Sequence, residues 1–450
     1  MTILHITPHL GGGVGAVICA WLKNDSSSNK HFVVSLDNNI NKDNYDTLNN
    51  LYNCTIFEGI WNKKNYVDFV NQKISESDVV ILHWWNHPLT FDFIYNVKLL
   101  PCRLIVWCHT ACTCPPNVLT EDVVNYADKV VFTSPVSYSS RDVKKLVKKH
   151  REKFELIWST SGVEKFLSKN KTEHNGFVVG YIGTADFSKL YNNFIKLCSK
   201  ITDENVRFEV YTIDSQEELK KQSYDMGIVN RFFFGGKVPH DKMPEILARF
   251  DVLGYPLQKG HYGTCEQALG EAMAAGIVPV CMNNPCEKNI VENGVNGFLC
   301  KSEKEYVKTI ESLISGAKDL KALSDSSRVR AKQVYSIEKM IEKWDALIES
   351  AVERGKHCHF CGLNQNSLKL PLLPHELYIR SLGRYGKPFG KYVFAKRKMQ
   401  KKIACKKITK LFRKNHSFLS NSKGSPIQYL KYFKDSEILL FWSNLARQFR

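Results

Sequence analysis

The stretch that decides the fold is HYGTCEQALGEAMAAGIVPV, residues 261–280. It opens with a glycine-led turn, continues as a helix that we predict over residues 266–275, and ends at Gly276, a residue type common just after a helix C-terminus. The continuous apolar run Val278–Cys281 follows and predicts a buried strand. Because a second apolar run, Val252–Tyr255, precedes the turn, the whole stretch is typical of a strand–helix–strand unit in a parallel sheet.

The same alternation of apolar runs and amphipathic stretches extends in both directions along the chain. The other predicted strands are Ile3–Thr7, His31–Leu36, Val79–His83, Leu104–Cys108, Lys129–Thr133, Phe177–Ile182, Arg207–Thr212, Phe232–Gly235 and Gly297–Leu299. A polar break near residues 159–175 divides them into two blocks. We therefore predict two doubly wound, Rossmann-like α/β domains with a ligand cleft between them.

Charge separates the last hundred residues from the rest of the chain. Residues 351–450 contain 22 basic and 4 acidic side chains, whereas residues 1–350 contain 41 of each, so the net charge of +18 belongs to the C-terminal part. The strand–helix alternation also stops near Gly355. The predicted domains are 1–165, 166–335, a closing helix at 336–355 that completes the second block, and a basic helical extension at 356–450.

Composition excludes several classes of protein. A hydrophobic content of 43% excludes global disorder. No apolar run approaches the roughly 20 residues of a membrane-spanning helix. The N-terminus lacks the pattern of a secretory signal, and the 14 cysteines show no framework spacing. We therefore expect reduced thiols and a cytoplasmic protein.

Glycines at two strand–helix junctions are candidate phosphate-binding turns. The first is Gly11–Gly15, with Gly12 and Gly13 at its centre, and the second lies around Gly263. Glycine lets a ligand approach the backbone, and the N–H groups at a helix start favour an anion. A turn without a ligand is the alternative at Gly11–Gly15, which is not a clean dinucleotide fingerprint. Glu271, within an otherwise apolar helix, needs polar partners, and ligand hydroxyls suit it.

Together these motifs resemble the group 1, or family 4, retaining glycosyltransferases of the GT-B fold, which carry an E-x7-E signature. The run Glu271–Val280 resembles the core of their donor-binding region. Other pieces follow in the family's order over roughly residues 1–350: Ile3–Gly15, Val130–Ser134, Ser161–Val163, Val179–Gly183 with Lys189, Phe234–Val238, and Glu287 through Phe298. The resemblance implies sugar transfer with retention from a UDP- or GDP-linked donor.

Two departures from the family pattern affect the donor site. The first glutamate of the signature falls on Gly263, and this chain has Glu266 instead, five residues before Glu271. On a helix those two glutamates lie about 140° apart, so Glu266 reaches the sugar only if the turn is unwound there. Thr184 stands where the family has an arginine, which leaves Lys189 and the helix start to carry more of the diphosphate charge.

The resemblance assigns roles to particular residues. Lys189 and the N–H groups near Gly263 stabilise the departing diphosphate, and Glu271 holds the ribose hydroxyls. His109, at the end of a predicted strand, contacts the sugar or the acceptor, with a structural loop histidine as the alternative. The donor-binding residues are Gly12, Gly13, Gly183, Thr184, Gly236, Lys237, Tyr262, Gly263, Thr264 and Glu266. No metal or other cofactor is expected.

Two cysteine- and histidine-rich segments leave a zinc site open as an alternative. One contains Cys108, His109, Cys112 and Cys114, and the other is 357–361, which includes Cys358 and Cys361. Neither has the paired spacing that tetrahedral zinc sites usually use. His83, Trp84 and Trp85 follow a strand of the first domain and suit an acceptor sugar, although ordinary packing explains the tryptophans equally well.

The extension suits an anionic membrane surface. Its basic stretch includes Lys396, Arg397, Lys398, Lys401, Lys402, Lys406 and Lys407, and Trp442 lies on an apolar stripe further on. Polybasic helices with aromatic anchors bind such surfaces. A helical appendage packed on the body and a nucleic-acid-binding tail are the alternatives, and the tail has no nucleic-acid recognition motif.

We predict a glycosyltransferase that moves a sugar to a glycan or lipid-linked acceptor. The expected setting is the assembly of bacterial surface polysaccharide, such as lipopolysaccharide or capsule, at the cytoplasmic face of the inner membrane, with partner transferases nearby. A nucleotide-sugar epimerase of the same fold and a catalytically degenerate scaffold remain alternatives.

Overall fold

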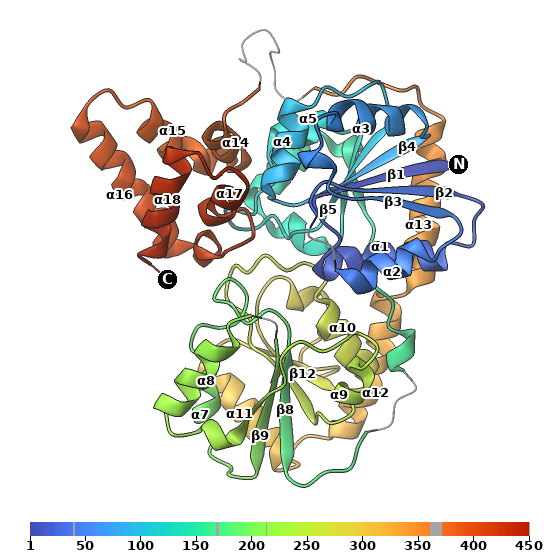
Figure 1. Cartoon of the computed structure of the whole chain (residues 1–450). Helices are drawn as coiled ribbons and strands as arrows, with labels where there is room; N and C mark the ends of the chain where they lie inside the picture. Colours follow the sequence, from blue (N-terminus) through green and yellow to red (C-terminus); the bar gives the residue numbers. More distant parts are fainter. Residues whose placement is uncertain (39–40, 168–170, 213, 361–370, 450) are drawn as a thin grey trace. The chain divides into compact units, whose positions relative to one another are not determined.

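The computed structural model describes residues 1–38, 41–167, 171–212, 214–360 and 371–449. The chain divides into two compact units, which are coloured along the sequence in Figure 1. The first unit combines Met1–Ser161 with Ile337–Arg450, and the second is Gly162–Ser336. The first unit is thus formed by both ends of the chain.

The first unit contains a seven-stranded parallel sheet with the order β3-β2-β1-β4-β5-β6-β7. Its strands are β1 Thr2–Thr7, β2 Lys30–Ser35, β3 Cys54–Phe57, β4 Val79–Trp84, β5 Leu104–Cys108, β6 Lys129–Phe132 and β7 Phe154–Leu156. The helices of this sheet domain are α1 Gly12–Asn24, α2 Lys42–Asn49, α3 Tyr66–Ser75, α4 Pro88–Asn96, α5 Glu121–Tyr126 and α6 Arg141–Lys149. Strands β3 and β7 are short, and neither was predicted from the apolar runs of the sequence.

The second unit contains a six-stranded parallel sheet with the order β10-β9-β8-β11-β12-β13. Its strands are β8 Phe177–Ile182, β9 Val206–Tyr211, β10 Phe232–Phe234, β11 Val252–Tyr255, β12 Val278–Met282 and β13 Phe298–Cys300. Its helices are α7 Phe194–Ser199, α8 Gln216–Asp225, α9 Met243–Leu247, α10 Gln267–Ala274, α11 Glu303–Ile314 and α12 Leu320–Val334. Figure 1 shows helices on both sides of each sheet, which confirms the predicted fold of two doubly wound domains.

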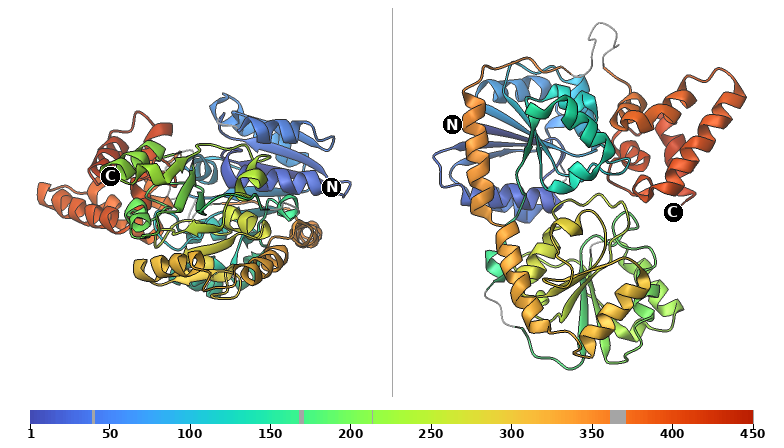
Figure 2. Two further views of the ribbon diagram at one scale, coloured as in Figure 1. Left: turned by 90° about the horizontal axis from the view of Figure 1, so that it is seen from below. Right: turned by 180° about the vertical axis from the view of Figure 1, so that it is seen from behind.

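Helix α13, Ile337–Val352, belongs to the first unit, contrary to our expectation that it closes the second block. Its buried residues recur at helical spacing and form one stripe. Within that stripe Trp344 stacks on Trp21, with ring centroids 4.7 Å apart, and lies equally close to Trp107 of β5. The stripe completes the core between α1 and the first sheet, along which α13 runs in Figure 2.

The C-terminal extension is helical, as predicted, and has a small core of its own. Its helices are α14 Pro374–Ser381, α15 Lys387–Val393, α16 Lys398–Lys414, α17 Pro426–Tyr432 and α18 Glu437–Arg447. Trp442, which we expected to contact a membrane, is fully buried against Tyr378 and Phe389. The stripe on α18 therefore faces this core because packing buries more of an indole ring than a surface contact does.

The extension is anchored to the sheet domain of the first unit by polar contacts. The side chain of Asn86 donates to the carbonyl of Ser381 at 3.1 Å, and the Tyr432 hydroxyl donates to Asp37 at 2.6 Å. Among the described residues, no helix is both long enough and apolar enough to cross a membrane.

Candidate functional site

The predicted donor turn lies between β11 and α10 in the second unit. Glu266 is the N-cap of α10 and adopts a left-handed backbone conformation, with φ 42° and ψ 68°. The backbone is therefore not helical at Glu266. This is the conformation that we required for the Glu266 side chain to reach the sugar. The helix ends where expected, because Gly276 has φ 81°. A Cβ atom built on Gly276 would lie 2.4 Å from the Arg328 guanidinium.

Two predicted site residues, Lys189 and Glu266, form a buried ion pair. The Lys189 Nζ lies 2.9 Å from the Glu266 Oε2, which also accepts from the Tyr255 hydroxyl at 2.5 Å. Burial opposes both charges, but each partner offsets that cost, so the pKa of Lys189 is raised and the pKa of Glu266 is lowered. The other oxygen, Oε1, is buried without a hydrogen bond in the described part of the chain.

The carboxylate of Glu266 also lies directly over Gly263. A Cβ atom built on Gly263 would come within 1.6 Å of Oε1, so the absence of a side chain at 263 is what makes room for Glu266. The Glu266 carboxylate thus occupies the space that a side chain at position 263 would need.

A second buried acid, Glu287, holds the turn and was not among our predicted site residues. His261 accepts from the Gly263 N–H through Nδ1 at 3.1 Å, and its Nε2 lies 3.3 Å from Glu287. Glu287 is fully buried and also receives the Asn284 amide at 3.4 Å. Only tertiary contact reveals this role, since His261 and Glu287 are 26 residues apart.

Glu271 is nearly buried on α10 and has a protein partner. Its Oε1 lies 2.9 Å from Nε2 of His240, whose Nδ1 lies 2.8 Å from the Lys165 Nζ. We expected ligand hydroxyls as the partners of Glu271, and the sequence analysis missed both His240 and Lys165. The His240 side chain is about half exposed, whereas the Glu271 side chain is 8% exposed.

The remaining predicted donor-binding residues lie after β8, after β10 and on the turn before α10. Gly183 follows β8 with φ 145°, and the Thr184 carbonyl accepts from the Tyr181 hydroxyl at 2.5 Å. Gly236 has φ 68°, and Lys237 beside it is exposed, with no ion pair in the described residues. Tyr262 and Thr264 are half-buried on the turn itself.

In the first unit, the glycine cluster forms the start of a helix instead of a separate loop. Helix α1 begins at Gly12, inside the glycine cluster, and Gly12 and Gly13 are exposed in its first turn. Gly15 has a packing role, because a Cβ there would lie 2.3 Å from the Leu10 carbonyl oxygen.

His109 lies just after β5 and is half-buried, with its Nε2 3.0 Å from Nδ1 of His83. His83 itself is fully buried, as is Trp84, which packs against Phe91. The assignment of His83 and Trp84 to acceptor contact is therefore wrong for their side chains, which lie inside the unit. Trp85 is 8% exposed and contacts the rings of His9 and His109.

The described residues contain no group of three or more histidine, cysteine or acidic side chains arranged to hold a metal ion. The Cys108 and Cys112 thiols lie 3.3 Å apart and are both buried. In the other segment, both ring nitrogens of His359 face backbone carbonyls, at 2.8 and 3.0 Å. Cys361, a member of that predicted alternative, lies outside the described residues.

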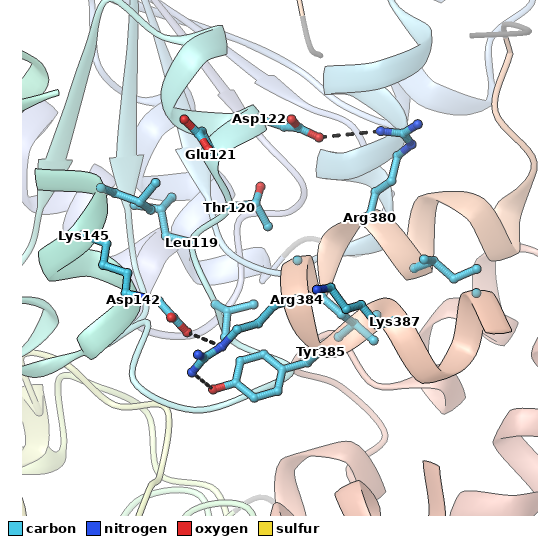
Figure 3. Close-up of a pocket in the computed structure, with 17 residues that line it drawn as sticks. Leu119, Thr120, Glu121, Asp122, Asp142, Lys145, Arg380, Arg384, Tyr385 and Lys387 are labelled. Carbon is cyan, nitrogen blue, oxygen red and sulfur yellow. Dashed lines mark hydrogen bonds and ion pairs between the residues drawn. The ribbon is translucent and has the colours of Figure 1, made fainter. Parts of the chain in front are cut away.

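A cavity of about 550 Å³ lies where the extension meets the sheet domain of the first unit. Figure 3 shows arginines of the extension reaching acidic side chains across it. Arg384 pairs with Asp142 at 3.1 Å, and Arg380 lies 3.7 Å from Asp122. None of the residues that we predicted for the donor or acceptor site lines this cavity.

Comparison with known proteins places this geometry among sugar-transferring enzymes. Residues 163–330, nearly the whole second unit, match the sequence model of the glycosyl transferases group 1 family. No curated protein matches the sequence closely enough to count as a relative.

Solved structures share the fold at low sequence identity. The Anabaena protein HepE, in complex with UDP-glucose, is 18% identical with a TM-score of 0.61, covering 78% of this chain and 100% of its own. A glycosyltransferase of Rickettsia africae is 14% identical with a TM-score of 0.60, covering 78% and 99%. The lipopolysaccharide outer core galactosyltransferase WaaB is 15% identical with a TM-score of 0.55, covering 78% and 100%. The match over residues 163–330 and the shared architecture thus support a glycosyltransferase with the GT-B fold.

Proposed function

We propose that the enzyme transfers a sugar, with retention, from a UDP- or GDP-linked donor to a glycan or lipid-linked acceptor. The observation that carries this proposal is the buried pair of Lys189 and Glu266 at the start of α10, inside the group 1 domain. That HepE was crystallised with UDP-glucose supports a nucleotide-sugar donor.

The chemistry follows from what the leaving group needs. Cleavage of the sugar–phosphate bond builds negative charge on the diphosphate, and Lys189 with the first N–H groups of α10 stabilises that charge. Glu266 holds Lys189 in its charged form before the donor binds. Glu271 accepts the ribose hydroxyls after His240 swings away, and this exchange needs no metal ion.

The extension positions the enzyme at an anionic membrane, through a surface that differs from the one expected. Between residues 394 and 449, the exposed large apolar side chains are Phe394 (75%), Met399 (65%) and Ile403 (48%), together with Leu440 and Phe441. They accompany the exposed lysines of α16, a combination that favours anionic lipid headgroups. A lipid-linked acceptor and a role in surface polysaccharide assembly beside partner transferases fit this placement, and WaaB is a neighbour of that class.

A donor screen tests the proposed reaction. We expect one UDP- or GDP-sugar to raise the Tm of the full chain, because a ligand that binds only the folded state stabilises it. Lys189→Met should abolish that shift, whereas Lys242→Met, a change at an exposed lysine of the same unit, should not. No shift with any nucleotide sugar would contradict the proposal.

Product analysis separates the alternatives. Release of nucleotide that depends on an added glycan acceptor supports transfer. Conversion of the donor alone into a second nucleotide sugar indicates an epimerase, and binding without turnover indicates a scaffold. NMR of the anomeric proton in the product shows whether configuration is retained.

Vesicle sedimentation tests the membrane surface. Phe394→Ser combined with Met399→Ser and Ile403→Ser should weaken binding of the full chain to anionic vesicles at least tenfold, without opening the core around Trp442. Binding should also fall with salt and be weak for neutral vesicles. Equal binding by the variant and the parent chain would refute this surface.

A further inference from the structure

Four histidines form a continuous row inside the first unit. They come from four neighbouring positions of the sheet: His31 on β2, His5 on β1, His83 on β4 and His109 just after β5. In the strand register, His31 lies beside Ile3, two residues before His5. The same offset of two residues separates each histidine from the next. The row therefore stays on one face and climbs toward the carboxyl edge of the sheet.

Each ring is hydrogen-bonded to the next. His31 Nδ1 lies 3.1 Å from His5 Nε2, His5 Nδ1 lies 3.1 Å from His83 Nε2, and His83 Nδ1 lies 3.0 Å from His109 Nε2. His5, His31 and His83 are fully buried. Trp21 and Trp107 contact these rings edge-on or tilted and help to exclude water.

An acidic residue ends the row on the side away from His109. Asp25 accepts two hydrogen bonds. Its Oδ2 accepts from His31 Nε2 at 2.7 Å, and its Oδ1 accepts from the Ser27 N–H at 2.8 Å. Burial opposes its charge, but these bonds hold the pKa of Asp25 at about 2. Burial also lowers the pKa of His5 and His83, and lowers the pKa of His109 to about 3, so these rings are neutral.

The count of protons then fixes the direction of every bond. A neutral imidazole carries one N–H, and an ionised carboxylate only accepts. The row has four rings and four hydrogen bonds, the last of them to Asp25. With one proton on each of the four rings, every ring donates through Nε2 toward Asp25, which leaves Nδ1 of His109 as an acceptor. In the described residues no hydrogen bond reaches this nitrogen.

We propose that Asp25, acting through His31, His5 and His83, sets the tautomer of His109 and makes its Nδ1 a hydrogen-bond acceptor at the carboxyl edge of the sheet. Asp25 is thus a positioning residue, and the rings of three histidines separate it from His109, whose Nδ1 it controls. The identity of the ligand rests on the proposed function: the group that donates a hydrogen bond to Nδ1 is a hydroxyl of the sugar or of the acceptor. A group that only accepts hydrogen bonds, such as a carbonyl oxygen, would find no proton on this Nδ1.

Asp25→Asn is the decisive variant. The Ser27 N–H needs an oxygen acceptor, so the asparagine places its oxygen toward Ser27 and its NH₂ group toward His31. An NH₂ group donates, so every bond in the row reverses and His109 then carries its proton on Nδ1. Asp345→Asn is the matched control, because Asp345 lies close enough to Asp25 for their charges to interact but is not hydrogen-bonded to the row.

Nitrogen NMR of the histidine-labelled full chain reads the tautomers directly. We expect the Nε2–H form at all four histidines of the parent chain and of Asp345→Asn, and the Nδ1–H form in Asp25→Asn. An Nδ1–H form of His109 in the parent chain would overturn the proposal, whether or not any variant folds. So would an unchanged His109 in folded Asp25→Asn.

A second variant tests transmission through the row. His5→Phe interrupts the hydrogen bonds, so adding Asp25→Asn to it should leave the tautomer of His109 unchanged. A reversal in the double variant would mean that Asp25 acts by another route. If sugar transfer is measured, Asp25→Asn should lower kcat about tenfold with little change in donor KM, the loss of one hydrogen bond. Failure of that result alone, with the tautomers as expected, counts against the proposed ligand and not against the row.

Discussion

The two units bury polar groups in opposite ways. The first unit buries a row of hydrogen-bonded histidines ended by Asp25, whereas the second buries the charged pair of Lys189 and Glu266 beside His261 and Glu287. When each ring in the row has one N–H to donate, the donor-to-acceptor direction of one hydrogen bond sets the direction of the next. A charged pair instead keeps a cation in place where an anion is to form. One architecture thus buries its polar groups through a row of hydrogen bonds in one unit and through paired charges in the other.

The largest expected effect distinguishes the units by pH. The lowered pKa of His5 and His83 means that the unfolded chain takes up protons below pH 6.5 while the folded first unit does not, so its stability falls as pH falls. Between pH 6.5 and 5, His5 and His83 each cost about 2 kcal/mol, about 4 kcal/mol together. His109 adds to this loss.

Tryptophan fluorescence measures that loss selectively, because all eight tryptophans lie in the first unit. The denaturant midpoint followed by fluorescence should fall steeply from pH 7 to pH 5. The second unit should not follow, since the pKa of His261 is raised and the pKa of Glu266 is lowered. Equal acid sensitivity of both units by hydrogen exchange would contradict the contrast.

Breaking the charged pair comes next. Lys189→Met leaves Glu266 buried without its cation, and removal of one partner of such a pair costs about 3–5 kcal/mol. Hydrogen exchange should show the loss in the second unit, while tryptophan fluorescence of the first unit stays the same. Adding Glu266→Gln to Lys189→Met should recover part of the stability, and no recovery would mean that the pair is not the cause.

A smaller effect is expected at the turn that accommodates Glu266. Gly263→Ala places a methyl group 1.6 Å from the Glu266 carboxylate, which Lys189 and Tyr255 hold in place. We expect a loss of about 1–3 kcal/mol from overpacking and weaker donor binding. Gly227→Ala is a useful control, because nothing crowds its α-carbon although its φ of 69° adds some strain. An unaffected Gly263→Ala variant would show that Glu266 moves freely.

The smallest effect concerns the junction with the extension. Arg384 is about half exposed where it pairs with Asp142, so Arg384→Ala should change the unfolding free energy of the first unit by less than about 1 kcal/mol. Chemical denaturation followed by fluorescence measures it. A loss of several kcal/mol would mean that the arginine, and not the hydrogen bonds of Asn86 and Tyr432, holds the extension in place.

Apolar runs and glycine positions predicted much of this molecule. The strands β8 and β11 coincide with their predicted bounds, since buried parallel strands are apolar throughout and end at polar turns. The resemblance carried by Glu271–Val280 also led to the turn that holds Lys189 and Glu266. The sequence did not reveal that α13 returns to the first unit, because an amphipathic stripe does not identify the sheet that it covers.

The site shows the same division. Residue types and order along the chain determined that two parallel sheets form, that a glycine-led turn lies between β11 and α10, and that the net charge resides in the extension. Tertiary structure alone decided that Trp442 is core, that His240 meets Glu271, and that four histidines from separate strands form one row. Local patterns depend on neighbours along the chain, whereas a hydrogen bond between His5 and His83 depends on strand order and register, which no local pattern specifies.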